Sequence, residues 1–289
     1  MQNKNVLEKV KTLRELTGVG FKDCKNAIDE NNGDIEKSIE FLRKKGIAKA
    51  SKRMGRTAAE GLICVYMQDN KFSMIEINSE TDFVAKNNEF INFAEEISKL
   101  ALVNSGKIDD ILDSKMKNKK NVKDNLVDLI SKIGEKITLR RCSFFGNNKT
   151  INFSYTHSSL KKNVGKLGVL ISLETNKSKN DISDFGKQLT MHVAASAPLA
   201  IDKDDLDQKL LQKEKEIITE ELKNSGKDIK IVEKIAIGKL NKFITENTLM
   251  NQEWIMEPKK KVKDIIKEIS GKDKIKIKQF KRFKVGEGL

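Results

Sequence analysis

The sequence has few of the residues that build metal centres and covalent catalysts. Its 289 residues include three cysteines and two histidines. Cys24, Cys64 and Cys142 lie far apart and form no Cys-x-x-Cys pair, and His157 and His192 are equally isolated. This spacing argues against a zinc site and against a disulfide scaffold, and it suits a reducing compartment. We therefore expect no metal and no cofactor.

Long apolar runs are also missing. No run reaches the roughly 18 residues that a membrane-spanning helix needs. The first ten residues, MQNKNVLEKV, lack the apolar centre of a secretion signal. The sequence contains no nucleophile elbow and no Walker A loop, and its few histidines and cysteines argue against a histidine-based triad. We expect a soluble, cytoplasmic protein that is not an enzyme and has no membrane partner.

Charge is abundant, with 56 Lys and Arg against 42 Asp and Glu and a formal net charge of +14. A basic chain suits an acidic partner or nucleic acid, but the predominance of lysine fits biased coding equally well. Aromatic residues make up only 6% of the chain, and no RNP-like string is present. Single-strand binding needs stacking aromatics beside the basic groups. We therefore expect no direct nucleic-acid contact.

One basic run, EPKKKVKD at 257–264, has the composition of a nuclear signal. Val262, Ile265 and Ile266 lie in and just after this run, at a spacing that makes one helical face. A solvated loop that enters a helix is therefore the better interpretation.

Residues 5–50 predict a compact bundle of three short helices. The breaks TGVGF, at 17–21, and NNGD, at 31–34, separate the helices, and Gly33 and Asp34 suit a C-cap and an N-cap. Residues 44–61 form a basic connector that could be helical. The three expected apolar faces are Leu7, Val10, Leu13 and Leu16; Cys24, Ala27 and Ile28; and Ile35, Ile39 and Leu42.

From residue 61 the pattern changes to strands and helices. GLICVYM and KFSMIEI flank QDN and predict a β-hairpin, and two helical patterns follow at 90–100 and 122–133. Three strand-like runs come next: KITLRRCSFF, TINFSYTH and LGVLISLE. A helix at 182–197 ends near Pro198, and the alternation in KIKIKQFKRFKV marks a final strand. We expect that strand to join the sheet that begins at 137.

Residues 203–249 predict an antiparallel pair of amphipathic helices. NSGKD, at 224–228, interrupts them with Gly226 as a stop and Asp228 as a restart. The surface of the pair is mostly polar, so the hairpin should project from the body as an insertion. The members of its expected apolar stripe are Leu206, Leu210, Ile217 and Leu222, and Ile231, Ile235, Leu240 and Ile244.

The stretch INSETDFVAKNNEF, at 77–90, passes from a strand to a helix through a polar corner that contains a large aromatic, Phe83. Either Phe83 tucks beneath its own loop, as most phenylalanines do, or the corner presents it to a partner. The residues alone favour the first interpretation. His157, at a strand end, could be exposed and functional, whereas His192 lies on an apolar helix face and is expected to be a core residue.

Four segments resemble the elongation factor Ts family, in the family's order and over essentially the whole chain. LRELTGVGFKDCKNAIDENNGDIEKSIEFLRKKG is similar to its UBA-like N-terminal domain, and EINSETDFVAKNNEF is similar to its signature. MHVAASAPLAI and RFKVGEGL match two further segments. The resemblance implies an α+β fold: an N-terminal three-helix UBA-like domain, a core of two related antiparallel-sheet-plus-helix subdomains, and an inserted antiparallel helical hairpin.

The implied domain boundaries are 1–54 for the UBA-like domain and 55–140 for the first core subdomain. The second subdomain comprises 141–200 and 250–289, and the hairpin, also called the coiled-coil or dimerisation domain, is 201–249. Family members commonly continue beyond VGEG with another helix, whereas this sequence ends at Leu289.

The resemblance implies a guanine-nucleotide exchange factor that binds elongation factor Tu, promotes GDP release and is displaced by GTP. A loop of four residues would enter beside the magnesium site of Tu, and further residues would contact other Tu surfaces. A homodimer through the hairpin is a further expectation, and a basic adaptor that binds RNA or ribosomes is the alternative. The implied contacts are Thr81, Asp82, Phe83 and Val84 at the magnesium site, and Val19, Gly20, Phe21 and His157 elsewhere.

Overall fold

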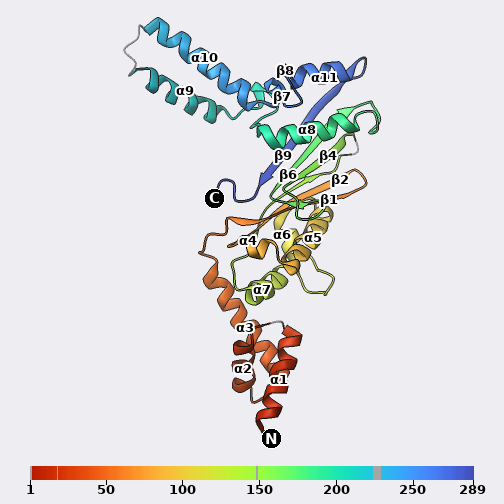
Figure 1. Ribbon diagram of the computed structural model, residues 1–289, viewed down its shortest axis with the longest axis vertical. Helices are drawn as coiled ribbons and strands as arrows, with labels where there is room; N and C mark the ends of the chain where they lie inside the picture. The colour runs from red at the N-terminus through yellow and green to blue at the C-terminus, as the bar shows by residue number, and fades with distance from the viewer. Residues whose placement is uncertain (1, 18, 148, 224–228) are drawn as a thin grey trace.

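The structure is a computed structural model that describes residues 2–17, 19–147, 149–223 and 229–289. A helical bundle stands at one end of an elongated molecule, sheets with covering helices form the body, and a helical hairpin projects at the other end (Figure 1). The α+β architecture expected from the sequence is therefore confirmed.

The N-terminal bundle comprises α1 (Gln2–Thr17), α2 (Phe21–Glu30) and α3 (Ile35–Arg53). Val10 and Leu13 lie in its core, but Leu7 and Leu16, expected on the same face, are 51% and 64% exposed. A spacing of three residues falls short of a full turn by about 60° at each step, so the two ends of that series diverge. Ile39 of α3 is also exposed, against expectation. The buried apolar residues that pack together in the core of the bundle are Val10, Leu13, Cys24, Ala27, Ile28 and Leu42.

Helix α3 runs on into the basic connector and joins the bundle to the body. It packs against α7 (Val122–Ile133). The Arg53 guanidinium donates to the carbonyl oxygen of Ile130 at 2.9 Å, and Arg43 pairs with Asp124 at 3.2 Å. The connector is therefore helical as far as Arg53 and is fixed to the body by side chains.

The first sheet has the strand order β3-β2-β1-β5 in the described residues. Its hairpin of β1 and β2 turns at Asp69 and Asn70, as the sequence predicts. Helices α4 to α7 cover one face, and side chains of β1 and β2 pack with Phe90 and Ile97 of α5 there. The bounds are β1 Glu60–Gln68, β2 Lys71–Ser79, β3 Thr138–Phe145, β5 Val164–Gly165, α4 Asp82–Ala85, α5 Asn88–Val103 and α6 Ile108–Asp113.

The second sheet has the order β4-β6-β9, with antiparallel pairing throughout. Side chains of α8 and α11 pack into its core, and a second layer between the two sheets contains Met74, Leu170 and Phe283. The bounds are β4 Ile151–His157, β6 Leu167–Thr175, α8 Ser183–Ser196, β7 Glu253–Trp254, β8 Glu257–Lys261, α11 Val262–Ser270 and β9 Ile275–Lys284.

Two expectations about these strands are wrong. The final strand, β9, pairs with β6, whereas the strand that begins near 137 is β3 and pairs with β2 in the other sheet. The expected boundary at 140 falls inside β3, and β5, which lies beyond that boundary, pairs with β1 in the first sheet. The basic run 257–264 contributes strand β8 rather than a loop, although Val262, Ile265 and Ile266 are buried on α11 as expected.

The projecting hairpin consists of α9 (Gln208–Lys223) and α10 (Ile229–Asn247). A small cluster of Ala200, Leu206 and Ile244 closes its base. The chain enters and leaves at neighbouring points, because the Leu249 amide donates to the Ala200 carbonyl oxygen at 2.9 Å. The hairpin is therefore an insertion. Short helical segments, Lys203–Asp205 (η1) and Leu249–Asn251 (η2), flank it.

Part of the expected hairpin stripe is wrong or untested. Ile217 is 50% exposed, and its neighbour Ile218, four residues before Leu222, is buried instead. The interruption NSGKD at 224–228, including Gly226 and Asp228, and the side chain of Ile231 lie outside the described residues.

A buried carboxylate ties β2 to the C-terminal segment. Glu76 is fully buried, and its carboxylate accepts hydrogen bonds from Arg140 at 3.0 Å, Arg141 at 2.5 Å and the Gly286 amide at 2.9 Å. Burial raises the pKa of Glu76, but the hydrogen bonds from Gly286, Asn78 and Arg141 outweigh it and hold the pKa below its ordinary value. This network joins EINSETDFV to VGEGL, two of the segments that carry the family resemblance.

Replacement of Glu76 by Gln should destabilise the protein by about 3 kcal/mol at neutral pH. This is the low end of the range for breaking a buried ion pair, because both arginines retain some solvent contact. The contribution of a carboxyl with a lowered folded pKa is complete above the unfolded pKa of about 4.3 and is lost as the pH falls further. Urea unfolding at pH 7 and pH 3.5 should therefore show that the difference in unfolding free energy between the native protein and E76Q is smaller at pH 3.5.

The matched control is Glu174→Gln, which removes an exposed ion pair with Lys278 at 3.4 Å. It should change the unfolding free energy by less than about 0.5 kcal/mol at either pH. Equal losses in the two variants would contradict the importance assigned to the Glu76 network.

Candidate functional site

The corner after β2 presents Phe83 on a very short helix. Thr81 is the N-cap of α4, and its hydroxyl accepts from the Val84 amide at 3.5 Å. Val84 and Ala85 are buried beneath the helix, whereas Phe83 is 80% exposed. Two buried side chains therefore anchor the helix while the aromatic ring faces solvent. The expectation that Phe83 tucks beneath its own loop is wrong, because the neighbouring residues already fill the space against the body.

Two glutamates hold the backbone of this corner. The Glu135 carboxylate accepts from the amides of Glu80 and Thr81 at 3.1 and 3.0 Å, and from the Thr81 hydroxyl at 2.7 Å. In return, Glu80 accepts from the Lys136 amide at 2.6 Å and from the Arg56 guanidinium. Burial raises the pKa of Glu80, but these hydrogen bonds outweigh it and the pKa stays below its ordinary value.

Asp82 is charged and paired at the surface. It forms an ion pair with Lys86, one helical turn later, at 2.7 Å. That hydrogen bond lowers the pKa of Asp82, and the positive charges of Lys86 and Lys166 lower it further. The corner therefore places a carboxylate beside an exposed aromatic ring.

His157 lies at the exposed end of β4, as expected. Its Nδ1 atom lies 2.8 Å from the Tyr155 hydroxyl. Its carbonyl oxygen accepts from the Lys166 amide at 3.2 Å, and the Lys166 ammonium pairs with Glu60. Glu60 in turn pairs with Ser79, the last residue of the strand that leads into the corner. A chain of contacts through Lys166 and Glu60 thus joins the His157 strand end to the strand that precedes the corner.

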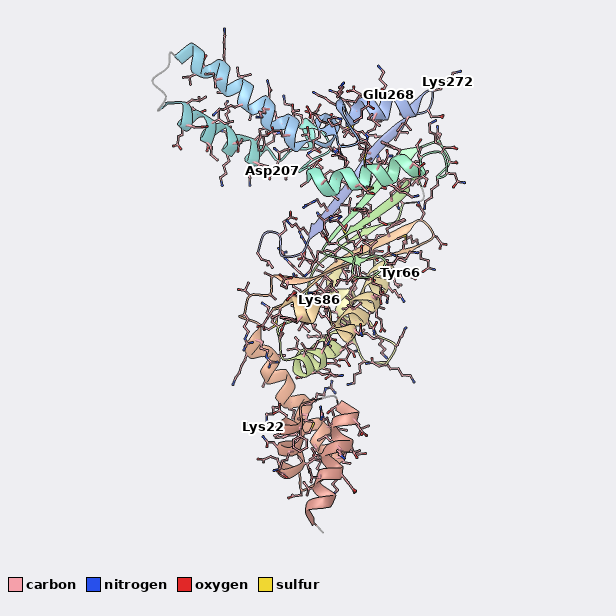
Figure 2. The ribbon with its side chains drawn as sticks, in the orientation of Figure 1. Lys22, Tyr66, Lys86, Asp207, Glu268 and Lys272 are labelled. Atoms are coloured by element: carbon pink, nitrogen blue, oxygen red, sulfur yellow. The ribbon has the colours of Figure 1, made fainter. Side chains whose placement is uncertain are left out.

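The segment Val19–Phe21 stands apart, in the N-terminal bundle. Gly20 is the N-cap of α2 with φ −59° and ψ 148°, and apart from its two chain neighbours no described residue has an atom within 4 Å of the position that a Cβ would occupy. Val19 is half-buried against the bundle core, and Phe21 is 45% exposed. In Figure 2, Lys22 marks this part of the bundle and Lys86 marks the corner on the body. The local fold therefore does not itself require glycine at position 20.

His192 is a core residue, as the sequence predicts. It is fully buried, its Nε2 atom lies 3.0 Å from Gln252, and its ring stacks on Trp254. Burial lowers the pKa of His192, which favours the neutral imidazole. Within the described ranges, no group of three or more His, Cys, Asp or Glu side chains could hold a metal ion. Among the helices in the described part of the chain, none has the length and apolarity to cross a membrane.

Sequence reasoning missed the residues that support the corner. Glu80 lies inside INSETDFVAKNNEF, but its hydrogen bonds with Glu135 and Lys136 join segments more than 50 positions apart, which no local pattern reveals. Glu135 follows Gly134, the left-handed C-cap of α7, and only the general rule that glycine ends helices marks this point. Glu76 looks like an ordinary outward-facing residue in an alternating strand.

The bundle, the two-sheet body and the projecting hairpin make an α+β protein whose Phe83 corner presents an exposed aromatic ring. The sequence model of the family described as "Elongation factor TS" matches residues 80–287. The chain is 43% identical to the elongation factor Ts of Bartonella henselae, over 97% of this chain and 92% of that protein. It is 41% identical to that of Methylorubrum extorquens, with the same coverage, and 40% identical to that of Rickettsia felis, over 97% and 91%.

The chain belongs to the elongation factor Ts family, and its role lies in the elongation stage of protein synthesis. The resemblance identified from four segments of the sequence is therefore confirmed.

Phe83→Ala should leave the stability of the protein almost unchanged, because the side chain is already exposed. The expected change in the free energy of unfolding is less than about 0.5 kcal/mol. The matched control is Phe90→Ala, in the helix that follows, which truncates a fully buried ring and should destabilise by about 3–5 kcal/mol. Urea unfolding of both variants measures the difference, and a core-like loss in Phe83→Ala would make Phe83 a packing residue.

Proposed function

We propose that this chain is a guanine-nucleotide exchange factor for elongation factor Tu. It binds the GDP form of Tu, disturbs the magnesium and phosphate site, promotes GDP release and is displaced by GTP. The observation that carries the proposal is the exposed Phe83 on its anchored helix, within the segment that resembles the family signature. Action on Tu requires a location in the cytoplasm.

The mechanism needs no catalytic base and no cofactor. The factor must fit nucleotide-free Tu better than nucleotide-loaded Tu, so that the binding of factor and nucleotide is negatively coupled and reciprocal. GTP then expels the factor by the same coupling. Burial of one aromatic side chain is worth roughly 1.5–3 kcal/mol, which corresponds to one or two decades of coupling. Phe83 is the proposed wedge that provides this contact.

The other residues of the corner have separate proposed roles. Thr81 caps the helix, and Asp82 brings a negative charge toward the magnesium site. Val84 supports the wedge from beneath, because its side chain is 8% exposed. These assignments give Phe83 and Asp82 the direct action on the partner, and make Thr81 and Val84 responsible for the presentation of Phe83.

Three further surfaces belong to the proposal. Val19, Gly20 and Phe21 form a second contact with Tu, supported by the exposure of Phe21 and the open space beside Gly20. His157 forms a third contact, supported by its exposure at the end of β4. Self-association through the hairpin is supported by exposed isoleucines on both of its helices, Ile217 at 50% and Ile237 at 62%.

Phe83→Ala should slow GDP release from Tu by about 10- to 100-fold, the factor that corresponds to losing one buried aromatic contact. The measurement is release of fluorescent GDP from purified Tu after mixing with excess factor and unlabelled nucleotide. Met67→Ala, which truncates an exposed apolar side chain at the far end of β1, is the matched control and should keep the native rate.

The alternative function, a basic adaptor for RNA or ribosomes, gives the opposite result in the same assay. It requires no acceleration of GDP release by the native protein, together with RNA binding that weakens steeply with salt. Acceleration by the native chain and loss in Phe83→Ala would exclude it.

Shortening the hairpin should separate self-association from exchange. Replacement of residues 213–238 with a short Gly-Ser turn keeps the basal cluster, in which Leu211 and Leu240 pack on Leu206 and Ile244. We expect unchanged GDP release and a lower dimer fraction in analytical ultracentrifugation. Failure of the shortened protein to fold, seen in its thermal unfolding, would show that the outer hairpin is part of the body's stability.

A further inference from the structure

Glu135 makes three hydrogen bonds to one short stretch of backbone and side chain. Its Oε2 atom accepts from the Glu80 and Thr81 amides at 3.1 and 3.0 Å, and its Oε1 atom accepts from the Thr81 hydroxyl at 2.7 Å. All three donors lie just before Phe83 in the chain. A carboxylate is suited to this task because it offers two acceptor oxygens and no donor.

The corner also accepts a hydrogen bond from the segment that contains Glu135. Glu80 accepts from the Lys136 amide at 2.6 Å, so the pairs 80–81 and 135–136 bond to each other reciprocally. The Lys136 ammonium then donates to the carbonyl oxygens of Met54 and Arg56, at 2.7 and 2.8 Å. The corner is thereby connected to the segment that enters β3 and to the end of the connector from the bundle.

The helix that carries Phe83 cannot hold its own orientation. Helix α4 spans only Asp82–Ala85, which is about one turn, and isolated helices of this length are unstable in water. Its orientation depends on the buried side chains of Val84 and Ala85 beneath it and on the fixed backbone at its start. Glu135 supplies that fixed backbone, because it bonds the N-cap and the residue before it.

We propose that Glu135 is a positioning residue for exchange: its carboxylate fixes the Glu80–Thr81 backbone and so aims the exposed ring of Phe83 at the partner. This inference rests on the proposed exchange function and adds to it a residue from a distant segment. Without Glu135 the corner samples several conformations, and only a fraction of molecules present Phe83 correctly. The apparent dissociation constant rises by the inverse of that fraction.

A positioning role predicts a specific split in the kinetics of exchange. Once the partner has bound, Phe83 occupies the same place in a protein that lacks the Glu135 carboxylate as in the native protein. The maximum rate of GDP release is therefore preserved. The factor concentration for half-maximal acceleration increases instead. Phe83→Ala differs, because it removes the wedge itself and lowers the maximum rate.

The test compares three variants with the native protein. Glu135→Ala removes every acceptor, and Glu135→Gln retains an amide oxygen that can still accept from the two backbone amides. The matched control is Glu96→Ala, which removes a carboxylate that accepts from the Lys117 amide at 2.6 Å elsewhere in the same subdomain. Amide hydrogen exchange at Glu80 and Thr81 is measured in the free protein, with the amides of Met74 and Ile75 in β2 as the internal reference for global folding.

In Glu135→Ala we expect protection at Glu80 and Thr81 to fall by at least about tenfold, since hydrogen bonds to a charged acceptor are lost. Protection in β2 should be unchanged, the half-maximal factor concentration should rise several-fold and the maximum release rate should stay within about twofold of native. Glu135→Gln should recover part of both losses. Glu96→Ala should match the native protein in both measurements.

Three results would overturn the proposal. Undiminished protection at Glu80 and Thr81 in Glu135→Ala would show that Glu135 does not hold the corner. Lost protection with an unchanged release curve would show that a held corner is not needed. Lost protection throughout β2 in both Glu135 variants would make Glu135 a general stability residue. Failure of the proposed function is distinguishable, because the native protein would then not accelerate GDP release at all, whereas the hydrogen-exchange result would still report on the corner.

Discussion

The structure depends on one strand that is buried on both faces. All residues of β2 after Lys71 are buried, and their side chains alternate between two cores. Ile75 and Ile77 face the helices of the first subdomain, whereas Phe72 and Met74 face the layer shared with the second sheet. A one-residue slip would exchange these two sets and expel Glu76 from its arginines. The register of β2 is therefore fixed, and so is the position at which it ends and the Phe83 corner begins.

Glu76 extends this constraint to the end of the chain. A buried carboxylate is costly unless hydrogen bonds satisfy it, and here two arginines and the Gly286 amide do so. Gly286 has φ +75°, and a Cβ there would meet the Ala59 carbonyl oxygen at 2.4 Å, so only glycine fits. The connector before β1, the middle of β2 and the VGEG segment are thus mutually constrained, although they are distant in sequence.

Local pattern predicted most of the elements but not their assembly. The hairpin at QDN, the helix from Asn88 and the projecting α9–α10 pair follow from periodicity and turn residues, which act over short distances. The assignment of β3 to the first sheet and of β9 to the second depends on pairing between distant strands, and an alternating pattern does not name its partner. The exposure of Phe83 escapes sequence reasoning for a related reason: burial of Val84 and Ala85 leaves no room beneath the corner, and only the assembled body shows this. Glu135 is one acid among 42 Asp and Glu, with no distinguishing spacing.

The rigidity of the corner determines how much of the free energy gained by burying Phe83 against a partner can act on that partner. Association must offset the ordering of side chains and loops, which costs about 0.5–1.5 kcal/mol for each immobilised flexible side chain. Phenylalanine has few rotatable bonds, the backbone just before Phe83 is held by Glu135, and its helix is anchored by Thr81 and two buried neighbours. Little ordering remains to be done when a partner arrives. For an exchange factor this low ordering cost matters more than affinity alone. Only the binding free energy that is not consumed by ordering the factor can weaken the binding of nucleotide to Tu. A mobile loop with the same aromatic residue would lose part of that free energy to its own ordering, so the rigidity of the corner is as much a part of the proposed mechanism as the ring that it presents.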